Sequence, residues 1–204
     1  MTDTEALLIL KEITASSLLK VDLDGQVLDE GSNIFPFNQA GYVIHSAVHA
    51  ARRDVNCVMH NHQLDCSAVA SMACGLLPMC QQACIVGDVA YHNYEGIAVD
   101  EGERARLGAD LGARSCMLLR NHGVLTVGKG VEDAWFLMFN LVLACRTQCA
   151  AMKCVGQEGL HMPSDDAQAA AAPVARRMCA EGFGVREFAA EVRLLEREGA
   201  SFRA

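Results

Sequence analysis

The chain lacks the features that mark several large classes of proteins. Its 17 Lys and Arg form no basic cluster and stand against 25 Asp and Glu, so the net charge of −8 argues against a nucleic-acid partner. No uninterrupted apolar run reaches the roughly 18 residues of a membrane helix, and the N-terminus has no signal-peptide pattern. We therefore expect a cytoplasmic protein with no membrane partner.

A disulfide framework and a paired-cysteine zinc site are also absent from the sequence. The ten cysteines are scattered through apolar segments, which indicates a reducing compartment and small core residues. Redox sensing or soft-metal binding is the alternative for pairs such as Cys80 and Cys84. Cys66 follows a pair of histidines closely, and for it the alternative is a place at the edge of a metal cleft.

Helix and strand patterns alternate along the chain, as they do when helices pack on both sides of one sheet. With 204 residues, 51% of them hydrophobic, the chain can bury the core of a single domain. The expected strands are 6–10, 18–23, 55–61, 86–91, 115–120 and 124–128, and the expected helices are 41–52, 63–74, 101–111 and 131–154.

The composition shifts after about residue 155, where alanine-rich and alternately charged stretches predict one or two amphipathic helices. These helices would pack on the body of the protein or on a neighbouring subunit, and a partner-binding tail is the alternative. We therefore divide the chain into a domain over residues 1–160 and a C-terminal helical extension over residues 161–204.

Three histidines carry the most information about function. Residues 55–59 are apolar and β-rich, so they place His60 and His62 at the end of a buried strand, where positions i and i+2 share one face. His122 lies at the predicted bend of a strand–turn–strand segment. Three imidazoles would leave a fourth metal position open, as catalytic zinc requires. The alternative is that they are ordinary polar residues at the rim of the sheet.

The other histidines are weaker candidates. His45 and His49 are four residues apart on a predicted helix, a spacing that can bind a metal. His92 is expected to form a hydrogen bond at the rim of the sheet, and His161 is expected to be solvated in the tail.

Longer blocks around the three histidines resemble the class II aldolase/adducin family. The blocks are residues 59–62, 75–78, 91–96 and 118–128, in the family's order, within a similarity over roughly residues 5–160. The adducin head-domain branch is the most similar. The resemblance implies a three-layer α/β/α sandwich with a central mixed, largely antiparallel sheet, and tetramers with clefts between neighbouring subunits. It also implies that His60, His62 and His122 hold Zn2+ or another divalent transition metal.

The chain departs from the family at the residues that perform its chemistry. The aldolases have a glutamate 19 residues before the first metal histidine, which binds the metal and abstracts the proton, and here that position is Gly41. Gln39 and Ala40 replace phosphate-binding serines, and Ala83 stands where related epimerases use an aspartate. The aldolases' tyrosine near the C-terminus has no counterpart, because the last tyrosine is Tyr94.

The beginning of the chain also differs from the family. Residues 5–11 match the family's second or third strand, so the elements that usually open the domain are not in this sequence. We expect either a domain shortened at its N-terminus or a reading frame whose start was set too late. A shortened sheet would expose an edge, which favours a homo-oligomer that buries it.

Two functions are consistent with these observations. One is a metal-dependent lyase, or a related epimerase or decarboxylase, that acts on a small carbonyl or sugar-phosphate-like substrate. Its base is not identified, and Glu95, Asp88 and Asp65 are the candidates. Arg120 would orient an anionic substrate or have a structural role, and Asn121 lies beside it.

The alternative is a non-catalytic oligomerisation or binding module like the adducin head. Gly41 favours this alternative, because glycine has no side chain that binds a metal or accepts a proton. The three retained histidines favour a metal centre, since a purely structural domain would not need them.

Overall fold

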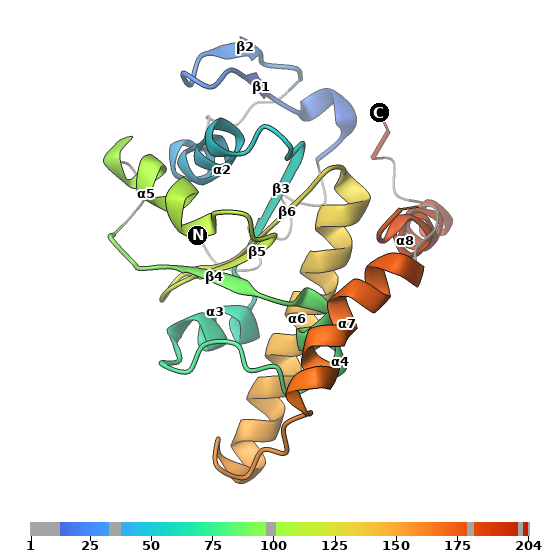
Figure 1. The fold of residues 1–204 in the computed structure, drawn as a ribbon. Coiled ribbons are helices and arrows are strands. Elements are labelled where there is room, and N and C mark those ends of the chain that lie inside the picture. The colour runs from blue at the N-terminus through green and yellow to red at the C-terminus, as the bar shows by residue number, and fades with distance from the viewer. Residues whose placement is uncertain (1–12, 33–37, 97–100, 179–181, 200–201, 204) are drawn as a thin grey trace.

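The structure, a computed structural model, describes residues 13–32, 38–96, 101–178, 182–199 and 202–203 (Figure 1). Within these ranges, four strands form a central sheet in the order β3 (Cys57–Asn61), β6 (Gly123–Gly128), β5 (Cys116–Leu119), β4 (Val89–His92). β6 runs antiparallel to both β3 and β5, whereas β4 is parallel to β5. The sheet is therefore mixed and largely antiparallel, as the sequence predicted.

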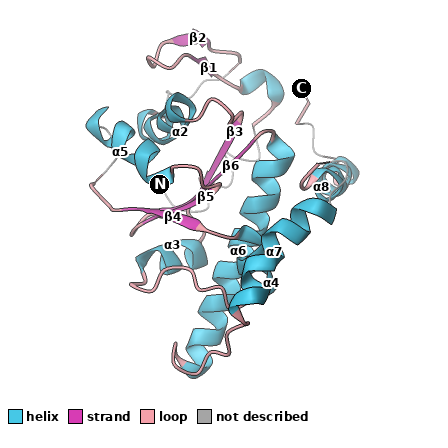
Figure 2. Ribbon diagram, in the orientation of Figure 1, coloured by secondary structure: helices cyan, strands magenta, loops and turns pink. Residues whose placement is uncertain are grey.

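Helices cover both faces of this sheet (Figure 2). On one face α2 (Gln39–Ala51) packs against α5 (Glu101–Leu111), and on the other α3 (Leu64–Ser71) packs against α6 (Val131–Val155). Met117 and Leu119 of β5 lie in the core cluster of the first face, and Cys116 and Leu118 lie in that of the second. This alternation follows from the two-residue period of a strand. The predicted three-layer sandwich is confirmed.

A glycine allows the two helices of the first face to approach closely. Gly108 lies inside α5, where glycine lowers helix stability. A Cβ atom at this position would lie 2.7 Å from the Cβ of Ala51 on α2, which is closer than side chains tolerate. The glycine therefore serves helix packing.

The C-terminal helices lie against the body of the molecule. α7 (Asp165–Met178) packs on the short α4 (Gln81–Val86), and α8 (Val185–Arg197) packs on α6 (Figure 1). The rings of Phe188 and Trp135 lie 5.7 Å apart across the α8–α6 contact. The expected amphipathic helices are thus present, and in this structure they cover the domain.

The remaining elements lie before the sheet in the sequence. A short 3₁₀-helix, η1 (Ala15–Ser17), precedes the hairpin of β1 (Lys20–Val21) and β2 (Val27–Asp29), which is separate from the central sheet. The expected strand at 18–23 is therefore limited to β1. The expected strand at 6–10 lies outside the described residues.

Helix α6 is long and apolar enough, by length and composition, to cross a membrane. It packs on β6, α3, α4 and α8, and its residues Leu137 and Leu141 are fully buried. The core helix of a globular domain has these properties, and this is how we interpret α6. A helix can therefore be long and apolar enough to cross a membrane although no uninterrupted apolar run in the sequence has that length.

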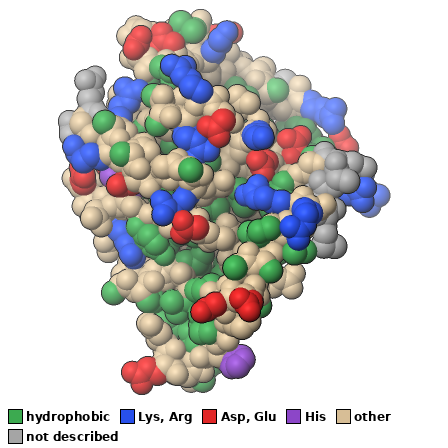
Figure 3. Space-filling model, viewed as in Figure 1, with side chains coloured by type: hydrophobic (Ala, Val, Ile, Leu, Met, Phe, Trp, Pro, Cys, Tyr) green, Lys and Arg blue, Asp and Glu red, His purple; other side chains and the backbone are tan. Residues whose placement is uncertain are grey.

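The surface and the cysteines agree with the composition. The face in Figure 3 carries acidic and basic side chains interspersed, with apolar side chains gathered where α4, α6 and α7 meet.

Five cysteines are buried as predicted, namely Cys66, Cys84, Cys116, Cys145 and Cys149. Cys66 lies in the second core cluster, and the pKa of its neighbour Cys145 is raised by their hydrogen bond and by burial. Both thiols are therefore core residues.

We predict that Leu137→Ala lowers the free energy of unfolding by about 2–5 kcal/mol, because it removes a fully buried side chain from the second core cluster. The matched change Leu194→Ala, on the outer side of α8, should cost less than about 1 kcal/mol. Urea unfolding followed by circular dichroism measures both values. Equal losses would contradict the assignment of α6 as the central core helix.

Candidate metal centre

Several functional residues meet at one end of the central sheet. Because β6 is antiparallel to its neighbours, the start of β6 lies beside the ends of β3 and β5. His60 lies near the end of β3, and His62 directly follows it. His122 occupies the turn between β5 and β6.

The three imidazoles converge at this end of the sheet. One candidate ligand atom from each of His60, His62 and His122 lies within 4.8 Å of the other two. The Nε2 atoms of His60 and His62 are 2.6 Å apart. The ring centroids of His60 and His122 are 4.9 Å apart, and those of His62 and His122 are 4.5 Å apart. The structure thus brings together the three histidines singled out in the sequence.

A backbone contact orients the first imidazole. His60 Nδ1 lies 2.9 Å from the carbonyl oxygen of Val124, which can only accept a hydrogen bond. Nδ1 therefore carries the proton, and the Nε2 lone pair faces the other two rings. Histidines that bind metals are oriented in this way by a partner on the other ring nitrogen.

The electrostatic environment keeps two of the imidazoles, those of His60 and His122, neutral. Burial lowers the pKa of His60 to about 4, and His62, His122 and His45 contribute further. Burial also lowers the pKa of His122, with a smaller contribution from His62. A metal requires neutral imidazole ligands, so these two rings are in the state that binds a cation.

The turn that carries His122 is fixed by local geometry. Asn121 adopts a left-handed conformation with φ of 57°, which asparagine tolerates better than most residues. The hydroxyl of Ser67 on α3 donates to the carbonyl oxygen of His122 over 2.8 Å. A Cβ at Gly123 would lie 2.4 Å from the carbonyl oxygen of Asn61 and 2.9 Å from the His62 ring. Only glycine allows β6 to start this close to β3.

The donor set suits a divalent transition metal. Three imidazole nitrogens leave a fourth tetrahedral position for a water or a substrate. With zinc–nitrogen bonds of about 2.1 Å, neighbouring ligand nitrogens would lie roughly 3.4 Å apart. The Nε2 atoms of His60 and His62, now 2.6 Å apart, would therefore have to separate by less than about 1 Å. His62 is exposed and can turn by this amount.

Each of the carboxylates proposed from the sequence as bases is paired with an arginine. Glu95 binds Arg106 of α5 through both carboxylate oxygens. Asp65 on α3 faces Arg146 at 4.0 Å, and Asp88 pairs with Arg114 over 2.6 Å. Asp88 also precedes β4, at the opposite end of the sheet from His122.

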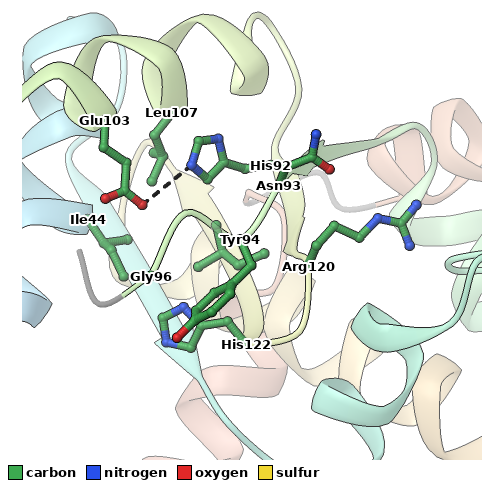
Figure 4. Close-up of a pocket in the computed structure, with 10 residues that line it drawn as sticks. Ile44, His92, Asn93, Tyr94, Gly96, Glu103, Leu107, Arg120 and His122 are labelled. Atoms are coloured by element: carbon green, nitrogen blue, oxygen red, sulfur yellow. Dashed lines mark ion pairs between the residues drawn. The ribbon is translucent and has the colours of Figure 1, made fainter. Parts of the chain in front are cut away.

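Arg120 is held by structural contacts. Its guanidinium lies 4.2 Å from the centre of the Tyr91 ring, and its Nη1 donates to the carbonyl oxygen of Met72 over 2.6 Å. Figure 4 shows its side chain pointing away from His122. These contacts favour the structural alternative for Arg120. The backbone amide of the neighbouring Asn121 donates to Ala70, which ties the turn to α3.

Gly41 lies in the first turn of α2, which Asn38 caps through its side-chain oxygen. A Cβ at Gly41 would meet only the Asn38 side chain, at an ordinary 3.5 Å. His45 lies one turn further on the same helix face and is close enough to affect the pKa of His60. In the described part of the chain, the cluster of metal-binding groups consists of the three histidines and contains no carboxylate.

The sequence did not point to a second polar cluster beside the centre. His92, at the end of β4, contacts Asp110 and Glu103 of α5. His92 and Glu103 share the lining of a small cavity with His122 (Figure 4). The hydrogen bond expected for His92 is present, and its partner Asp110 lies on α5, a contact that the sequence did not indicate.

The family model for the class II aldolase and adducin N-terminal domain matches residues 4–149. The chain belongs to the class II aldolase/adducin family. It is 47% identical over 150 residues to alpha-adducin from Mus musculus, an alignment that covers 73% of this chain but only 20% of alpha-adducin. The chain therefore spans a small part of this longer relative.

Two solved structures of the family are similar to almost the whole chain. An aldolase II superfamily protein from Pseudomonas syringae matches with a TM-score of 0.85 and 46% identity, over 95% of this chain and 76% of that one. L-fuculose 1-phosphate aldolase from Glaciozyma antarctica matches with a TM-score of 0.77 and 28% identity, over 94% and 73%. The fold and the family inferred from the sequence are confirmed.

We predict that Gly123→Ala weakens metal binding by about 10-fold or more, because its Cβ separates β6 from Asn61 and His62. Gly41→Ala is the control, since its Cβ meets no close contact. Titration with zinc in a competing chelator measures both affinities. An unchanged affinity in Gly123→Ala would show that the close approach of the strands is not needed.

Proposed function

We propose that this protein binds a divalent metal, Zn2+ in the first instance, through His60, His62 and His122. We propose further that it uses this centre for chemistry at the carbon next to a carbonyl, as a lyase or as a related epimerase or decarboxylase. The observation that carries the proposal is the convergence of the three imidazoles, with His60 oriented by Val124.

The proposed roles follow from the donor set. A bound zinc ion would act as a Lewis acid that polarises the carbonyl oxygen of the substrate. His60, His62 and His122 would hold the ion, and Ser67 would keep the turn of His122 in place through its hydrogen bond. Glu95, Asp65 and Asp88 are each engaged with an arginine, which disfavours them as the base.

The substrate class is supported by the family and restricted by the departures from it. One structural relative is an L-fuculose 1-phosphate aldolase, and this supports a small hydroxylated carbonyl compound. Gln39 and Ala40 replace the serines expected to bind phosphate. We therefore propose a substrate whose recognition does not depend on a phosphate at that position.

A second candidate function is a non-catalytic binding or oligomerisation module. It is favoured by Gly41 at the position of the family's glutamate and by the 47% identity to alpha-adducin. The two candidates differ in their need for the metal, since a binding module requires neither a metal nor an open coordination position.

We also propose that the protein is a cytoplasmic homo-oligomer, with a tetramer as the expected form. The scattered cysteine thiols support a reducing compartment. Members of the family are commonly oligomeric, and their clefts between neighbouring subunits would complete the small cavity beside His122. Light scattering coupled to size exclusion determines the stoichiometry.

We predict that protein purified without added metal contains about one zinc per chain, and that His60→Ala reduces this to near zero by removing the oriented ligand. His161→Ala, in the exposed part of the C-terminal extension, is the matched control and should keep its zinc. Elemental analysis provides the measurement. The absence of metal from the unaltered protein would overturn the proposed enzyme and leave the binding module.

We predict that Gly41→Glu increases zinc affinity by about 10-fold or more, because the new carboxylate projects from the helix face that carries His45. Helix α2 should tolerate the change, since glutamate is a better helix former than glycine and suits the first turn. Gly41→Gln controls for size without charge. Equal affinities in the two variants would show that this position does not reach the metal.

A further inference from the structure

A buried imidazole with two carboxylate neighbours lies close to the candidate metal centre. His92 is only 4% exposed, and its Nδ1 lies 2.7 Å from Oδ2 of Asp110. Its Nε2 lies 3.6 Å from Oε1 of Glu103, which is itself buried. Asp110 thus accepts the Nδ1 proton and fixes the direction in which Nε2 points.

The second ring nitrogen of His92 lacks a hydrogen bond among the described residues. The distance of 3.6 Å to Glu103 is too long for one. Buried polar atoms without a partner are rare in folded proteins, and a catalytic role is one of the recognised reasons for them. We take Nε2 of His92 as a candidate for a catalytic role.

The residue that carries this nitrogen lines the same cavity as a proposed metal ligand. His92, Glu103, Tyr94 and His122 all line it, with Ile44 and Leu107 as its apolar wall. Figure 4 shows Glu103 and His92 facing each other across this space, with His122 at its other side. A small molecule held at the three histidines would have His92 within the same enclosure.

We propose that His92, oriented by Asp110, is the proton-transfer residue of this cleft and takes over the role that the family's glutamate would have at Gly41. The proposal rests on the metal-dependent carbonyl chemistry proposed above. The arrangement is that of a general base in which a carboxylate fixes the tautomer of an imidazole and stabilises its protonated form.

The proposed step is a proton transfer that balances within the cleft. The Nε2 lone pair of His92 takes a proton from the carbon next to the carbonyl group of the substrate. The electron pair of that C–H bond forms a carbon–carbon double bond, and the carbonyl π electrons move to the oxygen. Asp110 stabilises the imidazolium, and Nε2 returns the proton to carbon in the reverse step.

A purely structural role for the cluster makes a different prediction. In that case His92 would only tie β4 to α5, and its replacement would affect stability alone. His92→Asn separates the two roles, because the asparagine amide nitrogen can replace Nδ1 in the bond to Asp110 while Nε2 is removed. His161→Asn is the matched control, since the same substitution is made at a histidine that is exposed in the C-terminal extension.

The test uses zinc-loaded protein and two probes. Glycolohydroxamate, whose planar oxygen atoms mimic an enediolate, reports binding through the ¹⁵N signal of His92 Nε2. Dihydroxyacetone reports proton transfer through exchange of its carbon-bound hydrogen with solvent deuterium. Zinc content and thermal stability are measured for every variant.

We expect glycolohydroxamate to shift the Nε2 signal of His92 in the unaltered protein. We expect His92→Asn to keep its zinc and lose exchange by about 100-fold or more. Asp110→Asn should show a smaller loss of exchange than His92→Asn, and His161→Asn should exchange at the rate of the unaltered protein. Where dihydroxyacetone is not a substrate of the unaltered protein, a shift of the Nε2 signal by glycolohydroxamate alone supports the assignment.

Two results would overturn the assignment of His92 while the proposed function stands. They are exchange in His92→Asn within threefold of the unaltered protein, and an Nε2 signal that glycolohydroxamate does not move although it binds. Unaltered protein that takes up no zinc is a separate outcome. It would overturn the proposed function, and the role of His92 with it.

Discussion

The hydrogen bond between His60 and the carbonyl oxygen of Val124 is the contact on which the candidate site depends. It joins β3 to β6 where both strands meet the cleft, and it directs Nε2 of His60 toward the other two imidazoles. The contact forms because Gly123 lets the backbone of β6 approach Asn61 without a side chain between them. The geometry of the site is therefore set by backbone pairing in the sheet.

The electrostatics of this end of the sheet follow from the same arrangement. Burial keeps His60 and His122 neutral, and the carboxylates of Glu95 and Asp65 are paired with arginines. A divalent ion held by three neutral imidazoles would keep its full charge and would polarise a carbonyl strongly. Glycine at position 41, where the resemblance implies a glutamate, would therefore remove a base while leaving a stronger Lewis acid. We propose that His92 supplies the missing base.

The sequence predicted the parts of the structure that depend on local patterns. The two-residue spacing of His60 and His62 and the turn around His122 located the cluster, and apolar periodicity located α5 and α6 closely. The short α4 was missed, because six residues are too few for a helical period to stand out. Local sequence patterns also did not predict how short β1 is, or that its hairpin is separate from the central sheet, because both depend on which strands pair with each other.

The sequence could not predict contacts between distant segments. Asp110 and Glu103 meet His92 only because α5 packs across the end of β4. The direction of Arg120 depends on the left-handed conformation of Asn121 and on the stacking surface of Tyr91. These features became visible only in three dimensions, and they led us to propose His92 as the base and a structural role for Arg120.

Zinc K-edge X-ray absorption of the purified protein tests the three-histidine centre most directly, because it counts and identifies the atoms bound to the metal. We expect three imidazole nitrogens at about 2.0–2.1 Å and one or two further oxygen ligands. Sulfur neighbours at about 2.3 Å would place the metal on cysteines instead, and would contradict a centre built from His60, His62 and His122.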